Sequence, residues 1–214
     1  MARRVLALAW GVLGLALAAV LVIGLLAPVS ASAGGKHKPR SRSIVLQVDY
    51  NGIPVRTYTV AQLQALTPFP GYAGFMKSTG TIIGPDAVTG VRVTDIVADA
   101  LGTPLTASES VDVADANPAD PYDVILSYDQ LVNLTGFAMY NATTGNPVAI
   151  SSLTGPLATL LVYSDPLQRV MPAATAGPLR FMIVDATSEN AVMYSQASVY
   201  HVNFLNVIDP GGAR

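Results

Sequence analysis

The sequence predicts an α+β domain that is mostly β, with mixed sheets and short helices. Its composition is rich in Val, Thr, Ala, Gly and Pro and poor in Glu and Lys, which favours strands and turns over long surface helices. Many segments alternate apolar and polar residues with the period of two that is typical of a half-buried strand. Apolar spacing typical of a helix occurs only in short stretches. Residues 43–214 are long enough to form one such domain with a substantial core.

An Asn-Gly pair predicts a β-hairpin at the start of this domain. Apolar and polar residues alternate over 44–50 and again over 53–58, on either side of Asn51-Gly52. Alternation around Asn-Gly is the strongest short-range hairpin signal, because both residues accept the positive φ angles of the tight turn. Thr59 and Gln62 then have the spacing of a capping box, which predicts a short helix directly after the hairpin.

The rest of the domain is predicted to contain one long loop, one clear helix and a series of strands. Glycines and prolines are interspersed through residues 67–90, which is typical of an irregular and often functional loop. Residues 93–101 have helical apolar spacing, and Gly102 supplies the stop. At most one helical turn is expected over 129–132. The other strand candidates, separated by turn residues, are 110–114, 122–126, 137–140, 158–163, 179–184, 192–194 and 199–208.

The residues before this domain predict export from the cytoplasm. A charged start, an apolar run over 5–27 and the Ala31-Ser32-Ala33 triplet predict a signal peptide over residues 1–33. The apolar run also reaches the roughly 20 residues that span a bilayer, so an uncleaved membrane anchor over 5–27 is the alternative. Residues 34–42 form a basic linker. We therefore expect an extracytoplasmic protein, secreted or anchored, that meets the membrane only through this segment.

Charge and cysteine content exclude several classes of function. From residue 43 onward, six Lys or Arg stand against fourteen Asp or Glu, which argues against nucleic acid as a partner. The chain contains no cysteine, so it has no disulfide, thiolate metal site or thiol nucleophile. The phosphate-binding, hydrolase and zinc-protease motifs that we sought are absent from the sequence.

Four segments, by their order and spacing, resemble the oxidoreductase molybdopterin-binding domain, which has the sulfite-oxidase-like fold. They are Tyr58–Leu66 (YTVAQLQAL), Gly90–Val97 (GVRVTDIV), Pro121–Leu131 and Gly177–Val184 (GPLRFMIV). The last strand, through Ile208, is similar to the closing strand of that family. The resemblance spans about residues 43 to 209. It implies the family's fold and, as a cofactor, molybdopterin with molybdenum held by a cysteine.

This chain departs from the family pattern at that cysteine. In the family it lies on the loop before the Gly-Val helix, and here the corresponding stretch, 75–81, reads FMKSTGT. Hydroxyl groups are far less acidic than a thiol and are harder ligands. We therefore expect no metal ligands and no bound cofactor, and we assign no catalytic residue. Any pocket that persists is expected to use five residues, Lys77, Ser78, Thr79, Arg180 and His201.

Three functional hypotheses follow from these observations. The first is a non-catalytic module that binds an unknown small ligand or protein partner. The second is a molybdopterin-dependent oxidoreductase that uses an oxygen ligand to the metal from Ser78, Thr79 or solvent, and the third is a stalk-mounted structural domain. Two further sites each have a functional and a purely structural interpretation. His201 is either part of a catalytic triad or a half-buried strand residue, and four aspartates form either a calcium site or a solvated acidic turn: Asp112, Asp115, Asp120 and Asp123.

Overall fold

The structure is a computed structural model that describes residues 43–115, 122–164, 179–187 and 190–212. The predicted signal peptide or anchor and the basic linker lie outside these residues. Within the described ranges, every helix is too short or too polar to span a bilayer. The described domain is mostly β, with mixed sheets and few helices, as an α+β prediction requires.

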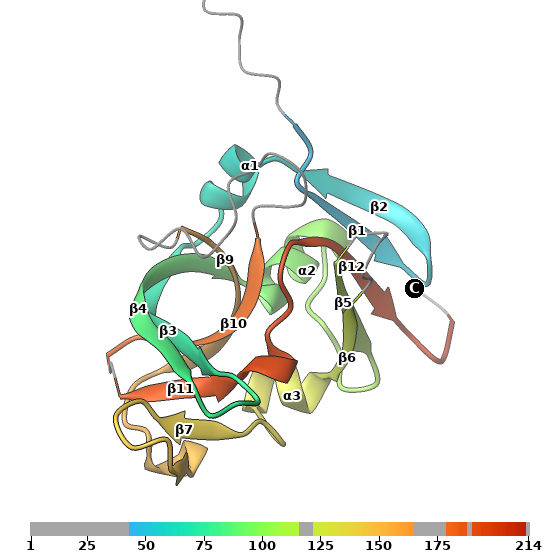
Figure 1. Ribbon diagram of the computed structural model, residues 1–214. Helices are drawn as coiled ribbons and strands as arrows, with labels where there is room; N and C mark the ends of the chain where they lie inside the picture. The colour runs from blue at the N-terminus through green and yellow to red at the C-terminus, as the bar shows by residue number, and fades with distance from the viewer. Residues whose placement is uncertain (1–42, 116–121, 165–178, 188–189, 213–214) are drawn as a thin grey trace, which may run out of the picture. The chain divides into compact units, whose positions relative to one another are not determined.

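The first of two sheets has five strands in the order β2-β1-β12-β5-β6 (Figure 1). Its strands β1 and β12 are parallel, and its other pairs are antiparallel. The buried residues Val48, Leu205 and Val113 lie side by side across three of its strands, so one face of the sheet supports the core. The strand bounds are β1 Leu46–Tyr50, β2 Ile53–Tyr58, β5 Ser110–Asp115, β6 Asp123–Ser127 and β12 Val202–Ile208.

The second sheet has seven strands in the order β10-β9-β4-β3-β11-β7-β8. A further pairing of β10 with β3, through Asp185 and Tyr72, makes β3, β4, β9 and β10 curl into a ring (Figure 1). The parallel pairing of β11 with β3 makes this sheet mixed as well. The strand bounds are β3 Phe69–Met76, β4 Ile82–Arg92, β7 Met139–Asn141, β8 Pro147–Val148, β9 Leu157–Ser164, β10 Arg180–Asp185 and β11 Ala191–Tyr194.

Short helices connect the strands, and the local signals in the sequence explain them. The hairpin prediction is confirmed, since Asn51 and Gly52 have φ angles of 50° and 76° between β1 and β2. The capping box is confirmed too: Thr59 Oγ1 accepts from the Gln62 N–H, and Gln62 Oε1 accepts from the Thr59 N–H. The helices are α1 Val60–Gln64, α2 Val93–Leu101 and α3 Tyr128–Asn133, with short 3-10 helices η1 Ile150–Ser152 and η2 Ser195–Ala197.

The prediction of a long loop over 67–90 is wrong, because β3 and β4 fill most of it. Three of the glycines that suggested a loop lie instead where a neighbouring backbone approaches a strand too closely for any side chain. The three closest approaches, from a Cβ added at the glycine to a carbonyl oxygen, are 2.5 Å each: Gly71 to Asp185, Gly74 to Ile83 and Gly90 to Leu161. Glycine inside a strand often marks such a close approach, and the one at Gly71 lies where the ring closes.

Three other predicted elements differ in their limits. The last strand begins at Val202 and not at residue 199, because His201 has a φ of 51°, which is outside the extended conformation of a strand. Helix α3 is longer than one turn, because Ser127 and Gln130 form a capping box that the sequence reading overlooked. Strand β7 starts two residues later than predicted, at Met139.

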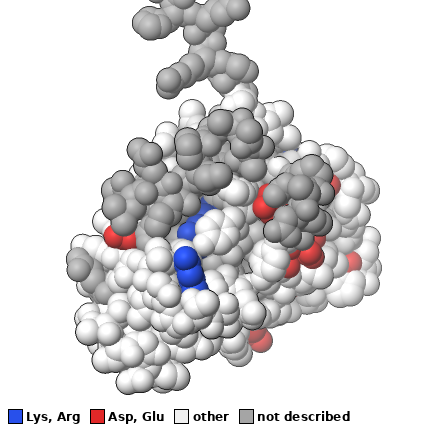
Figure 2. Space-filling model, viewed as in Figure 1, with Lys and Arg blue, Asp and Glu red and all other residues white. Residues whose placement is uncertain are grey.

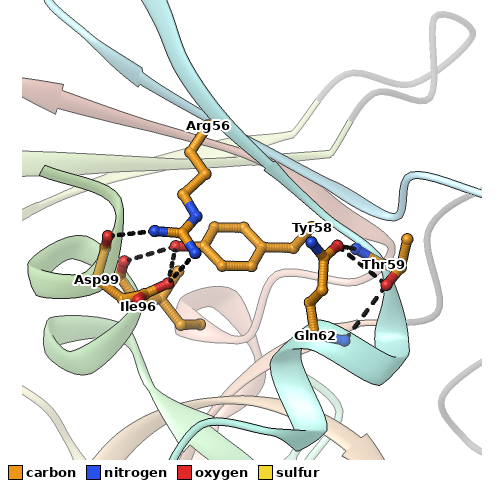
Figure 3. A network of polar contacts seen from close by, with 6 residues as sticks. All are labelled: Arg56, Tyr58, Thr59, Gln62, Ile96 and Asp99. Carbon is orange, nitrogen blue, oxygen red and sulfur yellow. Dashed lines mark hydrogen bonds and ion pairs between the residues drawn. The ribbon is translucent and has the colours of Figure 1, made fainter.

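A polar cluster fixes α2 against the first hairpin (Figure 3). The hydroxyl group of Tyr58 donates to Asp99 Oδ2 at 2.7 Å and to the Ile96 carbonyl oxygen at 3.3 Å. Arg56 Nη2 lies 3.1 Å from the same carboxylate, and its guanidinium stands 5.1 Å from the centre of the Tyr58 ring. Because Tyr58 is only 1% exposed, this cluster closes over part of the core. Burial, reinforced by the hydrogen bond to Asp99, raises the pKa of Tyr58 well above its ordinary value.

Candidate functional site

A cavity of about 530 Å³ lies between the ends of the two sheets. Its walls come from the end of β3 and the turn after it, the end of β5, the residue before β6, and the stretch from η2 to the start of β12. The lining residues are Phe75, Lys77, Ser78, Thr79, Asp115, Tyr122, Ser195, Gln196, Ser198, Tyr200 and His201. Aromatic rings, hydroxyl groups and a few charged groups therefore share one hollow.

The turn between β3 and β4 places three of the predicted residues at this cavity. The Lys77 N–H donates to the Thr81 carbonyl oxygen and the Gly80 N–H donates to the Lys77 carbonyl oxygen, both at 2.9 Å. Gly80 has a φ of 80°, a conformation that glycine adopts without strain. The turn is thus held by its own backbone, which leaves the side chains of Lys77, Ser78 and Thr79 at the cavity wall.

Lys77 differs from every other Lys or Arg that the structure describes. Arg56 and Arg92 pair with Asp99 and Asp95, and Arg180 is hydrogen-bonded and stacked on aromatic rings. The side chain of Lys77 makes no ion pair, hydrogen bond or ring contact within the described part of the chain. Its ammonium group is therefore free to meet an anion.

Arg180 lies behind the cavity wall, with its guanidinium group between two rings. The guanidinium carbon lies 4.1 Å from the ring centre of Phe75 and 3.7 Å from that of Tyr200, both within cation–π range. Its Nε donates to Ser198 Oγ at 2.8 Å, and the side chain is almost fully buried. Arg180 thus supports the aromatic wall and adds positive charge behind it.

His201 occupies a strained position at the cavity. Its φ of 51° lies in the left-handed region, which is uncommon for a residue other than glycine and costs free energy. Its Nδ1 is 3.6 Å from Asp115 Oδ2, while its Nε2 is buried and has no hydrogen-bond partner among the described residues. His201 precedes β12, so the interpretation as an alternating strand residue is wrong, although the side chain is largely buried.

The structure brings the five predicted site residues together. Lys77, Ser78, Thr79 and His201 line the cavity, and Arg180 contacts two of its aromatic residues. On the face drawn in Figure 2, the visible Lys and Arg atoms gather in one small area near the middle, away from the Asp and Glu atoms. That these five residues bind a cofactor stays a prediction.

Sequence reasoning missed the contribution of Tyr122 and η2. The hydroxyl group of Tyr122 donates a hydrogen bond to the Gln196 carbonyl oxygen, which ties the start of β6 to η2 across the cavity. These segments are more than seventy residues apart in sequence. Their only local signal was an aromatic residue at a strand end, so the fold was needed to find them.

The structure does not bring the described aspartates of the candidate calcium site together around one point. Asp120 lies outside the described residues, and Asp115 faces His201. Burial, and then the negative charge of Asp123, raise the pKa of Asp112. Within the described ranges, no group of three or more His, Asp or Glu is placed to hold a metal ion.

The residues at the cavity do not fit a molybdenum–molybdopterin group. The chain has no cysteine sulfur for the metal, and Thr79 Oγ1 is 3.2 Å from Thr81 Oγ1, so this hydroxyl already has a partner. A pterin phosphate needs several cations, whereas Arg180 is enclosed between its two rings. Lys77 is left as the exposed cation of the described cavity wall.

The comparison with known proteins supplies no family for this chain, since no family model and no curated protein matches it. The resemblance to the molybdopterin-binding domain therefore stays a prediction. The site has to be interpreted from its own geometry.

Proposed function

We propose that this protein is exported and that its domain binds a small anion in the cavity beside Lys77, without catalysing a reaction. In this proposal the domain has the sulfite-oxidase-like fold and has lost the metal centre of the family it resembles. The ligand is small because the cavity volume lies within the range of about 300–1,000 Å³ that is typical of small-molecule pockets.

The observation that carries this proposal is the distribution of basic residues. After the linker the chain has a single lysine, Lys77, and a single histidine, His201, and both line the same cavity. Arg180 lies directly behind the aromatic wall between them. The domain has eight more acidic than basic residues, so basic side chains are scarce in it, and their placement at one hollow favours an anionic ligand. The cavity wall also includes Asp115, whose carboxylate faces His201, so Lys77 is the group on the wall that is placed to meet an anion.

Two features support the proposed relation to the molybdopterin-binding fold. The described domain has the mixed sheets and short helices that the resemblance implies. The segment 75–81, where the family has its cysteine, contributes Phe75, Lys77, Ser78 and Thr79 to the cavity. A pocket at this place is consistent with a site that has kept its position and changed its ligand.

The main alternative is a molybdopterin-dependent oxidoreductase with an oxygen ligand to the metal. It is tested by purifying the exported protein from a molybdenum-replete host and measuring metal by mass spectrometry together with pterin fluorescence. Our proposal predicts molybdenum far below one equivalent and no pterin. Stoichiometric molybdenum would contradict it.

The other alternative is a stalk-mounted structural domain that binds no small ligand. A thermal-shift screen of small organic and inorganic anions on the exported protein separates it from our proposal. We expect at least one anion to raise the melting temperature, and we expect Lys77→Ala and Arg180→Ala to reduce that effect. N-terminal sequencing of the same preparation tests the signal peptide, since cleavage after Ala33 leaves Gly34 as the first residue.

A further inference from the structure

We infer that the anion bound beside Lys77 carries a flat aromatic ring, which stacks on Tyr200. This inference rests on the proposed function and adds the chemical class of the ligand. It depends on the arrangement of Arg180, Tyr200 and Lys77 around the cavity.

Tyr200 presents one side of its ring to the cavity. The residue is 37% exposed. Arg180, which is 1% exposed, covers the other side at 3.7 Å from the ring centre. Because the arginine side is closed to solvent, the exposed part of the ring is the part turned away from Arg180. Phe75 meets Tyr200 edge-on, with 6.0 Å between the ring centres, and holds the ring in place.

The guanidinium behind Tyr200 makes the free side of this ring a favourable stacking surface. The π face of an isolated aromatic ring is negative and repels the face of a second ring. A cation on one face draws that negative charge toward itself. An electron-rich ring, such as one that carries an anionic group, is therefore expected to stack on Tyr200 more favourably than on an unsupported tyrosine.

Lys77 supplies the partner for the anionic group of the same ligand. It lines the cavity together with Tyr200, and its ammonium group makes no contact within the described residues. Tyr122, held by its hydrogen bond to Gln196, adds a third aromatic ring to the wall, after Phe75 and Tyr200. A ring compound with one carboxylate meets both the aromatic wall and the ammonium group, which an inorganic anion or a neutral ring does not.

The inference is tested with four probes on the exported full chain, by isothermal titration calorimetry. Naphthalene carboxylate has both features, decalin carboxylate keeps the charge without a flat ring, naphthalene carboxamide keeps the ring without the charge, and inorganic phosphate has charge alone. We expect naphthalene carboxylate to bind about fivefold more tightly than decalin carboxylate, because only the former stacks. We expect a preference of about fivefold over the carboxamide from the ion pair with Lys77.

Three variants assign these preferences to residues. Lys77→Met should remove the preference for carboxylate over carboxamide and leave the preference for the flat ring. Tyr200→Leu should remove the preference for the flat ring and leave the preference for carboxylate over carboxamide. Arg56→Met removes an exposed cation that lies in the other polar cluster, and it should change neither preference. The probe comparison on the unaltered protein stands even if one of these variants fails to fold.

Different results contradict the two proposals. Equal affinity for the naphthalene and decalin carboxylates overturns the aromatic ligand but leaves an anion site in place. Equal affinity for the carboxylate and the carboxamide overturns the role of the anionic group. If none of the charged probes binds and no anion in the wider thermal-shift screen stabilises the protein, the proposed function itself fails.

Discussion

Two clusters in this domain each contain an arginine beside a tyrosine, but the tyrosine is buried in one cluster and partly exposed in the other. In the first, Arg56 and Tyr58 both contact the Asp99 carboxylate, and these contacts join β2 to α2 (Figure 3). In the second, Arg180 and Tyr200 stack at the wall of a cavity. In the first cluster Asp99 neutralises the arginine, whereas the second cluster lies beside the exposed Lys77, which has no ion pair among the described residues.

The difference separates a structural cluster from a candidate binding site. Tyr58 is almost fully buried and its hydroxyl group is hydrogen-bonded, so the free energy of this cluster contributes to folding. Tyr200 keeps more than a third of its surface exposed, and the cavity beside it contains the strained His201. Strain and exposed apolar surface that do not serve folding are typical of functional sites.

The largest expected difference between the clusters is in stability. Tyr58→Ala should lower the free energy of unfolding by about 3–5 kcal/mol, because it empties a buried site and leaves the Asp99 carboxylate without one of its donors. Tyr200→Ala should cost about 1 kcal/mol, since much of that ring is already in solvent. Urea denaturation followed by circular dichroism measures both values. Equal losses would contradict the distinction between the two clusters.

A smaller effect is expected at alkaline pH. The pKa of Tyr58 is raised in the folded protein, whereas in the unfolded chain it is about 10. Below that pH the tyrosine is protonated in both states. Above it the unfolded chain loses the proton first, so the free energy of unfolding falls with a slope of up to about 1.4 kcal/mol per pH unit.

The variant Tyr58→Phe isolates this contribution to the pH dependence. It keeps the ring and removes the titrating hydroxyl group, so its unfolding free energy should fall less steeply with pH than that of the unaltered protein. The measurement is a series of urea titrations between neutral pH and the alkaline limit. Identical slopes for the two proteins would mean that Tyr58 ionises equally easily in both states.

Within the first cluster, Asp99→Asn should lower the free energy of unfolding by about 1 kcal/mol, because it removes the charge that faces Arg56 and accepts from Tyr58. The matched control is Asp95→Asn on the same helix. Its ion pair with Arg92 is longer, at 3.9 Å, and exposed, so its loss should have little effect. Thermal and urea unfolding of both variants measure the two losses of stability. A larger loss for Asp95→Asn than for Asp99→Asn would contradict the prediction.

The smallest change in stability is expected at the cavity. Lys77→Met should alter the free energy of unfolding by less than about 0.5 kcal/mol, because the ammonium group contacts no other described residue. Urea denaturation alongside the unaltered protein checks this value. A loss of more than about 1 kcal/mol would mean that Lys77 has a structural partner and is not reserved for a ligand.

The sequence predicted those parts of the fold whose signals are local. The turn at Asn51-Gly52 and the cap at Thr59 depend on residues only a few positions apart, and both are confirmed. The strands over 67–90 were missed because Gly71 and Gly90 are required by backbones that approach from distant segments. No local pattern reports such an approach.

The same distinction applies to the candidate site. Lys77 was predicted because it lies on the segment 75–81, where the family resemblance places the missing cysteine, and His201 because it is the only histidine after the linker. Tyr122 and Gln196 meet only in the folded chain, and the stacking of Tyr200 on Arg180 is likewise a tertiary contact that alternation does not reveal. A resemblance and a rare residue type were therefore informative where periodicity was not.

The most direct test of this account compares thermal shifts in three proteins: the unaltered chain, Lys77→Met and Arg56→Met. The account predicts that Arg56→Met lowers the melting temperature but keeps the stabilisation by naphthalene carboxylate. It predicts that Lys77→Met keeps the melting temperature and shows a clearly smaller stabilisation by naphthalene carboxylate than the other two proteins. An equal shift with the anion in all three proteins would contradict the claim that the cavity beside Lys77 is an anion-binding site.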